Sequence, residues 1–233
     1  MTATDPGRPA TADPTSAGID QVAPPEERYE GVYGPFTITA TDRRDVFGYR
    51  LALLLVAITQ AALLIQWRWL GPEALWFWLL PLAMGLGLAL RWIHIYLRPL
   101  HRALQLFWLL GCLGLLALAI VAGPNAMAVT VATDGRWIWA IGPLFAALAG
   151  IGFKEFFCFR RPEAIGVTLL LPLALLGRLS GLLSTEACGL LLALEAALLL
   201  VLTLRKFPMP AAADVGDKSV FAYLEAQRLP PNA

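Results

Sequence analysis

Two ionisable residues stand inside long apolar stretches of the sequence. Arg178 lies near the end of one stretch and Glu195 in the middle of the next, and residues 184–186 form a polar break between them. If the two stretches form an antiparallel helical hairpin that turns at this break, both side chains lie at about the same depth. Because a charge among apolar helices is costly and usually faces a partner, the spacing predicts an Arg178–Glu195 ion pair.

This predicted ion pair has two interpretations. It fixes the register of the hairpin as a structural clip, or it marks a site for a proton or a substrate. The alternative is that the long Arg178 side chain extends to the nearer surface and leaves Glu195 protonated or bound elsewhere.

The two histidines of the chain, His94 and His101, flank Pro99 in a basic segment. A neutral imidazole can ligate haem iron or chlorophyll magnesium, so either histidine is a candidate pigment ligand. A bis-histidine haem takes its ligands from facing helices, whereas these two lie in one turn, which favours a basic surface for anionic lipid or an acidic partner. Two turns contribute to this predicted docking face, whose members are Arg91, His94, Arg98, His101, Arg102, Lys154, Arg160 and Arg161.

Motifs of common catalytic sites are missing from the sequence, which contains no HExxH, GxSxG, GxGxxG, P-loop or CxxC pattern. The cysteines, Cys112, Cys158 and Cys188, are too widely spaced for a cysteine zinc cluster. We therefore expect neither enzymatic activity nor a metal site.

The composition is that of a bilayer protein. Of the 233 residues, 58% are hydrophobic and 15% are charged, whereas a soluble domain has about 45–50% apolar and about 25% charged residues. Such a chain has too little polar surface for an ordinary water-soluble fold. The net charge of +1 gives no attraction to nucleic acid, so no nucleic-acid partner is expected.

Six apolar windows are long enough to cross a bilayer. A crossing needs about 20 mostly apolar residues, because a helix rises about 1.5 Å per residue and the hydrocarbon core is about 30 Å thick. The sequence therefore predicts an all-α polytopic membrane protein, a bundle of six transmembrane helices. The predicted spans are residues 49–70, 72–92, 103–122, 137–153, 164–183 and 187–204, and Phe156, Phe157 and Phe159 can lengthen the fourth.

The connections between these spans alternate in charge. On one side, the basic residues near span ends are only Arg68, Arg136 and Arg178, and the other side carries all the rest. Lysine and arginine concentrate in cytoplasmic loops. The alternation therefore predicts that both termini are cytoplasmic, and it supports an even number of spans.

The polar ends of the chain are expected to lie outside the bundle. Residues 1–30 contain almost no large apolar side chains, so we expect a disordered cytoplasmic leader, followed by a juxtamembrane segment at 31–48. The predicted transmembrane domain covers residues 49–204. A cytoplasmic tail follows at 205–233, with a short amphipathic helix at 218–227 that either docks or stays loosely ordered.

Small, aromatic and proline residues mark the predicted spans. Gly177 and Gly181 form a GxxxG pair, which is typical of close helix packing in lipid. Tryptophans crowd the first outer turn and the start of the fourth span, which indicates an interfacial belt or, alternatively, a platform for a pigment or quinone. Pro81, Pro143 and Pro172 lie within spans; prolines kink transporter helices but are also common in ordinary membrane helices.

Two turns carry a resemblance to a known family. Residues 91–101 read RWIHIYLRPLH and residues 152–159 read GFKEFFCF. With these turns, the chain from about residue 30 onward resembles a family of uncharacterised integral membrane proteins of cyanobacteria and plastids. The family offers no catalytic residues, and the resemblance implies a location in a thylakoid or related photosynthetic membrane.

Three functions remain open at this point. The leading prediction is a non-enzymatic accessory or assembly factor in the lipid bilayer of a thylakoid or bacterial inner membrane. It would pack against a larger membrane protein complex, for which the resemblance suggests a photosystem. The alternative is a small transporter or channel with Glu195 in its pathway. The third is a pigment-binding scaffold, with chlorophyll or carotenoid as its cofactor.

Overall fold

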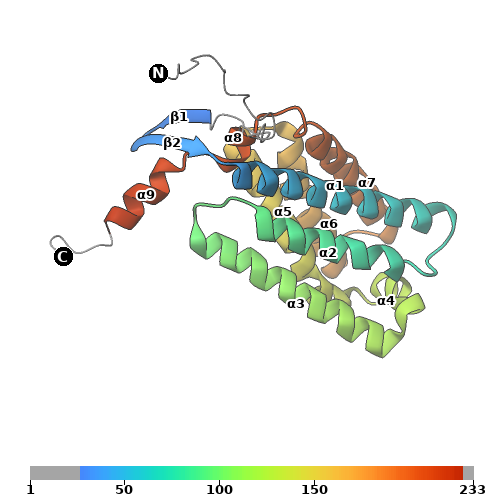
Figure 1. Cartoon of the computed structure of the whole chain (residues 1–233). Helices are drawn as coiled ribbons and strands as arrows, with labels where there is room; N and C mark the ends of the chain where they lie inside the picture. Colours follow the sequence, from blue (N-terminus) through green and yellow to red (C-terminus); the bar gives the residue numbers. More distant parts are fainter. Residues whose placement is uncertain (1–26, 228–233) are drawn as a thin grey trace, which may run out of the picture.

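Six long helices make up most of the computed structural model, which describes residues 27–227 apart from the side chains of residues 27, 221 and 222. Five of them are long and apolar enough to cross a membrane, and α2 is a shorter apolar helix. The prediction of an all-α membrane protein is confirmed, and each predicted span falls on one helix (Figure 1). The helices are α1 (Ala40–Trp69), α2 (Trp76–Trp92), α3 (Arg98–Ala122), α5 (Ile138–Phe159), α6 (Pro162–Leu179) and α7 (Thr185–Leu204).

The long helices form a closed ring. Each packs against the next in the order α1, α2, α3, α5, α6, α7, and α7 packs in turn against α1. Consecutive helices run in opposite directions, so α1 begins at the end of the ring where α7 ends (Figure 1). We call the end with Arg98, Arg160 and Lys206 the basic end, and the end with Trp67 and Trp137 the tryptophan end.

Short elements lie at both ends of the ring. Between α3 and α5, at the tryptophan end, are η1 (Pro124–Ala126), α4 (Met127–Thr133) and η2 (Gly135–Trp137). At the basic end are β1 (Glu27–Gly31), β2 (Gly34–Ile38), α8 (Ala211–Val215) and α9 (Ser219–Ala226).

The first helix begins at Ala40 rather than at Tyr49, where the predicted span starts. Thr39 and Asp42 form a capping box, in which each side chain accepts a hydrogen bond from the backbone N–H of the other. The 30 residues of α1 measure about 45 Å, more than the hydrocarbon core of about 30 Å. The helix therefore extends out of the membrane before its apolar part begins.

A β-hairpin precedes α1, which the sequence analysis did not predict. Strands β1 and β2 pair antiparallel, so residues 27–30 are not part of a disordered leader. Tyr29 and Phe36 stack on each other and pack against a small core of Ile38, Val46 and Val215. Burial of this apolar face explains why the hairpin is ordered. The rest of the predicted leader, residues 1–26, lies outside the described residues.

Glycines bring α3 and α5 into close contact. A Cβ added at Gly111 would lie against the backbone of Leu144, and one at Gly114 would collide with the backbone of Ala140. Small residues allow two helix backbones to approach closely where lipid provides no hydrophobic drive.

The predicted GxxxG pair does not make such a contact between helices. Gly177 packs against Leu183 of its own hairpin, and Gly181 lies beyond the end of α6 with φ +74°. This left-handed backbone favours glycine. Gly181 is therefore a turn residue, because α6 ends at Leu179, earlier than its predicted limit.

We predict that Gly114→Ala lowers the free energy of unfolding by about 1–3 kcal/mol, because the added methyl group overpacks the α3–α5 contact. Denaturant unfolding in a mild detergent measures this change. Gly189→Ala is the matched control, since no atom lies within 4 Å of a Cβ there and alanine favours the helix. Equal losses in the two variants would contradict the proposed close contact.

Candidate functional site

A buried charge cluster lies at the basic end of the bundle. At its centre, Lys206 Nζ donates hydrogen bonds to Glu155 Oε2 at 2.6 Å and to Asp214 Oδ1. Each member of the cluster is less than one-tenth exposed. The members are Tyr49 and Arg50 of α1, Lys154 and Glu155 of α5, Lys206 just after α7, and Asp214 of α8.

Every carboxylate oxygen of the cluster accepts a hydrogen bond. Glu155 Oε1 accepts from the Tyr49 hydroxyl at 2.6 Å and from Lys154 Nζ at 3.1 Å. Asp214 Oδ2 accepts from Arg50 Nε at 2.8 Å. Lys206 Nζ also lies 4.5 Å from the centroid of the Phe159 ring, which favours the ammonium charge through its π-face.

Arg50 connects the cluster to the chain that leaves α7. Its Nη1 donates to the carbonyl oxygen of Met209 at 2.8 Å, and its Nη2 donates to that of Pro210 at 3.2 Å. These carbonyls follow the end of α7, so Arg50 holds the segment between α7 and α8 against α1.

The arrangement of the cluster suits a structural lock. Burial makes each charge costly, and the opposite charges and hydrogen bonds offset that cost only when all partners are in place. Because Glu155 and Asp214 both hold donors on each oxygen, neither carboxylate is poised as a general base. The cluster therefore fixes α1, α5 and the segment after α7 relative to one another.

The predicted Arg178–Glu195 ion pair is wrong. Glu195 is fully buried, and its Oε2 accepts a hydrogen bond from Nε2 of Gln60 on α1. Arg178 Nη2 instead donates to the carbonyl oxygen of Ala132 on α4 at 2.6 Å. Glu195 faces α1 while Arg178 faces α4. The spacing in the sequence predicts the depth of each residue, but it does not predict the direction in which each side chain points around its helix.

Only some residues of the predicted docking face lie at the surface. Arg91, Arg98, Arg102 and Arg160 are exposed at the basic end. The prediction is wrong for Lys154, because its side chain is only 6% exposed and belongs to the charge cluster. It is buried because α5 continues beyond the predicted span, which places Lys154 inside the bundle.

Arg161 has a structural partner within the bundle. It lies 3.6 Å from the carboxylate of Glu163, which is buried and also pairs with Arg205 at 2.9 Å. The pairs join the start of α6 to the end of α7. Arg161 is partly buried, so it contributes less to an exposed basic surface than the prediction assumed.

The two histidines differ in their hydrogen bonding. His101 Nε2 lies 2.8 Å from the carbonyl oxygen of Leu90; because a carbonyl only accepts, Nε2 carries the hydrogen, and Nδ1 is the atom through which His101 could ligate a metal. Burial lowers the pKa of the His94 imidazole, which favours the neutral form that ligates metals. Both histidines stay candidate pigment ligands, and His101 also joins the start of α3 to the end of α2.

The hairpin and the C-terminal segment form one unit, which we call the platform (residues 27–38 and 216–226). Asp217 Oδ2 accepts a hydrogen bond from the backbone N–H of Val32 at 2.7 Å, and Ser219 Oγ accepts one from that of Tyr33 at 3.0 Å. The rings of Tyr33 and Tyr223 stack at 4.0 Å. Hydrogen bonds from Ser219 and Val32 hold the pKa of Asp217 below its usual value.

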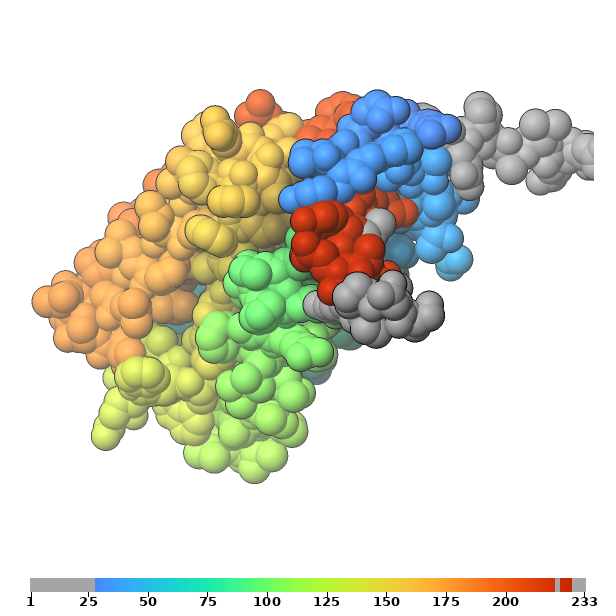
Figure 2. Space-filling model, turned by 90° about the vertical axis from the view of Figure 1, so that its left-hand side faces the viewer, coloured from blue at the N-terminus to red at the C-terminus, as the bar shows by residue number. Residues whose placement is uncertain are grey.

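Figure 2 shows the platform on the surface of the basic end. The hairpin (blue) and the C-terminal segment (red) lie side by side, next to the loop between α2 and α3 (green). Lys218 of the platform pairs with Asp42 in the first turn of α1 at 2.8 Å. Tyr96 of the loop donates to the carbonyl oxygen of Val215 at 2.8 Å. The platform is therefore attached to the bundle on two sides.

The predicted tail helix is present as α9, within the expected range of residues. In the part of the chain that the structure describes, no group of three or more His, Cys, Asp or Glu residues has the arrangement of a metal site.

A ring of apolar helices with its charges gathered at one end defines a polytopic integral membrane protein. A model of the family DUF2301, described as an uncharacterized integral membrane protein, matches residues 88–223, more than half of the chain. The chain belongs to this family, and the match includes both turns on which the resemblance was based. No curated protein and no solved structure matches the chain.

The sequence analysis missed the charge cluster, although signals for it were present. Arg50, Lys154 and Lys206 stand at the basic ends of three different spans, and Glu155 is a carboxylate at the same depth. An acidic residue among basic ones at a span end indicates a local ion pair. The contribution of Asp214 carried no such signal, because it depends on how the chain folds back after α7.

We predict that Lys206→Met lowers the free energy of unfolding by about 3–5 kcal/mol, because it leaves buried carboxylates without their cation. Chemical unfolding in one detergent, followed by circular dichroism, measures the change. Arg136→Met is the matched control: Arg136 pairs with Asp134 but its side chain is 88% exposed, so we expect little change. A Lys206→Met variant as stable as the control would contradict the structural lock.

Proposed function

We propose that the protein is a non-enzymatic accessory or assembly factor that packs against a larger membrane protein complex. The observation that carries this proposal is the exposed apolar surface of the platform. Val32 is 81% exposed and Tyr33 is 51% exposed, and Tyr223 and Leu224 are also exposed. These residues lie outside the apolar helices that are candidates to span the membrane, and exposed apolar patches of this kind mark interaction sites.

Exposed arginines lie at the same end of the bundle. Arg91, Arg98, Arg102 and Arg160 are exposed around the loops that adjoin the platform. An apolar patch bordered by positive charge favours a partner with a complementary acidic surface. Because the charge cluster and the Lys218–Asp42 pair hold the platform's supports in place, little flexibility would be lost on binding.

The family resemblance suggests which complex the partner is. We propose a photosystem as the complex, and a thylakoid or bacterial inner membrane as the location. A scaffold for pigment is a related proposal, in which neutral His94 would ligate chlorophyll and the apolar outer faces of the helices would contact carotenoid.

We predict that the protein, solubilised gently from its native membrane, migrates in native electrophoresis with a larger complex. Val32→Asp combined with Leu224→Asp should release it from that complex, because charges replace the apolar contact surface. Ala126→Asp, at an exposed position at the tryptophan end, is the matched control and should stay bound. Migration of the wild-type protein only as a monomer or self-oligomer, without partner or pigment, would refute the proposal.

A small transporter or channel is the second candidate function, and one feature favours it. Glu195 and Gln60 lie in the apolar middle of the ring, and within residues 27–227 the Oε1 atoms of both lack a hydrogen-bond partner. A proton on Glu195 Oε1 would provide the missing donor to Gln60 Oε1, so the pair can hold a proton in a membrane interior. Such groups often belong to proton or ion pathways.

We predict that, if this second function is correct, Glu195→Gln abolishes proton uptake into liposomes and leaves stability nearly unchanged, since the amide keeps the shape and the bond to Gln60. Uptake is measured with an enclosed pH-sensitive dye under a potassium diffusion potential. Thr59→Val, at the neighbouring buried position of α1, is the control variant and should keep uptake. Wild-type liposomes as proton-tight as empty ones would exclude a proton pathway.

A further inference from the structure

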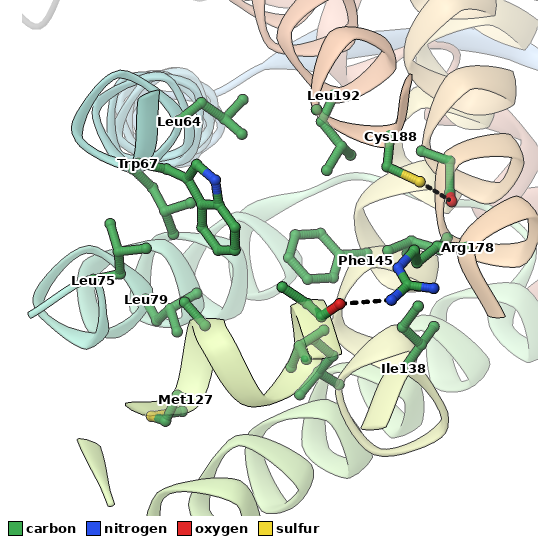
Figure 3. Close-up of a pocket in the computed structure, with 18 of the residues that line it drawn as sticks. Leu64, Trp67, Leu75, Leu79, Met127, Ile138, Phe145, Arg178, Cys188 and Leu192 are labelled. Atoms are coloured by element: carbon green, nitrogen blue, oxygen red, sulfur yellow. Dashed lines mark hydrogen bonds between the residues drawn. The ribbon is translucent and has the colours of Figure 1, made fainter. Parts of the chain in front are cut away.

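The ring of helices lines a partly open pocket of about 200 Å³ at the tryptophan end, which we call the cavity. All six long helices and α4 contribute to its wall, which is almost wholly apolar (Figure 3). Leu64, Trp67 and Leu79 line it on one side, and Phe145 and Leu192 line it on the other. It lies at the opposite end from the charge cluster and the platform, so it does not belong to the surface proposed above.

Arg178 is the one charged residue among the described residues of this wall. Its Nη2 donates to the carbonyl oxygen of Ala132 on α4 at 2.6 Å, while its Nε is buried without a hydrogen-bond partner. Figure 3 shows the guanidinium lying at the edge of the apolar space, above Ile138. A buried guanidinium nitrogen without an acceptor is costly, but Nε is covered by the protein itself. The feature open to an external anion is the positive charge of the guanidinium at the edge of the pocket.

The space beside Gly189 of α7 is not occupied by side chains of the neighbouring helices. Gly189 lines the wall, and a Cβ built on it would meet no atom within 4 Å. Membrane helices usually pack closely at such small residues, as α3 and α5 do at Gly114. The cavity is therefore a lasting gap in the packing that a ligand can occupy.

We propose that this cavity binds a single acyl chain with an anionic headgroup, with the chain in the apolar space and the headgroup at Arg178. An apolar cavity of about 150 Å³ or more stays dry and accepts apolar ligands. Arg178 stands in the last turn of α6, at the depth where the headgroup of a lipid or fatty acid meets the membrane surface. A carboxylate or phosphate there forms charge-assisted hydrogen bonds with the guanidinium.

A neutral occupant agrees less well with these observations. A carotenoid or hydrocarbon chain would fill the apolar space and leave the charge of Arg178 without a counter-charge in the pocket. An anionic headgroup accounts for both the apolar wall and the guanidinium at its edge. The headgroup can come from a free fatty acid or from a membrane phospholipid, and the two sources are distinguished by experiment.

Quenching of tryptophan fluorescence by brominated acyl chains tests the proposal, because Trp67 is in the wall. The purified protein in detergent is titrated with dibromostearate and with the corresponding neutral alcohol. We expect Arg178→Gln to raise the Kd for dibromostearate by about tenfold, the loss of a charge-assisted hydrogen bond, and to leave the Kd for the alcohol unchanged. Trp67→Phe should remove most of the quenching.

Two variants on α7 distinguish binding in the cavity from binding on the outer surface of the bundle. Gly189→Leu places a side chain in the open space, where a Cβ meets no atom within 4 Å, and it should weaken binding of both the acid and the alcohol. Its circular dichroism spectrum should match that of the wild type. Leu190→Phe is the matched control, since Leu190 is 73% exposed on the outer face, and it should bind as the wild type does.

Vesicles identify the source of the headgroup. Phosphatidylglycerol with brominated chains, compared with brominated phosphatidylcholine, tests a membrane lipid. If Arg178→Gln reduces the quenching by brominated phosphatidylglycerol, the ligand is a membrane lipid. If Arg178→Gln reduces only the quenching by dibromostearate, the ligand is a free fatty acid. The proposal would be overturned if Arg178→Gln bound dibromostearate as tightly as the wild type does. It would also be overturned if Gly189→Leu bound the acid and the alcohol with wild-type affinity.

Discussion

The structure depends most on the buried ammonium group of Lys206, which is held between the carboxylates of Glu155 and Asp214. An ion at this depth has lost most of its hydration, so it is stable only while both partners stay in position. One partner is on α5, and the other is on α8, which Arg50 of α1 also holds. A single requirement, that no charge be left unpaired, thus determines how three distant parts of the chain meet.

This requirement gives the two ends of the ring different properties. At the basic end, charged and aromatic side chains fill the interior, and their hydrogen bonds leave little freedom for rearrangement. At the tryptophan end, the interior is apolar, and packing in lipid has no comparable drive to close it. A cavity can persist there because the ring is already closed by contacts between α1 and α7 and fixed at its other end by the charge cluster.

The sequence predicted what the bilayer dictates and missed what depends on helix rotation. A span must be apolar over about 20 residues, so each long helix was found, including the extension of α5 to Phe159. Which side chains meet depends on the direction in which each helix face points. For that reason Glu195 was assigned to Arg178 rather than to Gln60, and Lys154 was assigned to the surface. The hairpin was missed because its apolar face is ordered by residues near position 215, far along the chain.

The position of the platform follows from the same physics. Its two parts come from opposite ends of the described chain, and the alternating directions of the six helices bring both parts to the basic end of the ring. The charge cluster then fixes the segment that precedes Asp217, and Asp217 in turn binds the hairpin at Val32. Exposing the apolar side chains of the platform to water lowers stability, and the helical bundle does not need this exposure in order to fold. The partner proposed above would cover this surface, and a rigid support would lower the entropy lost on binding.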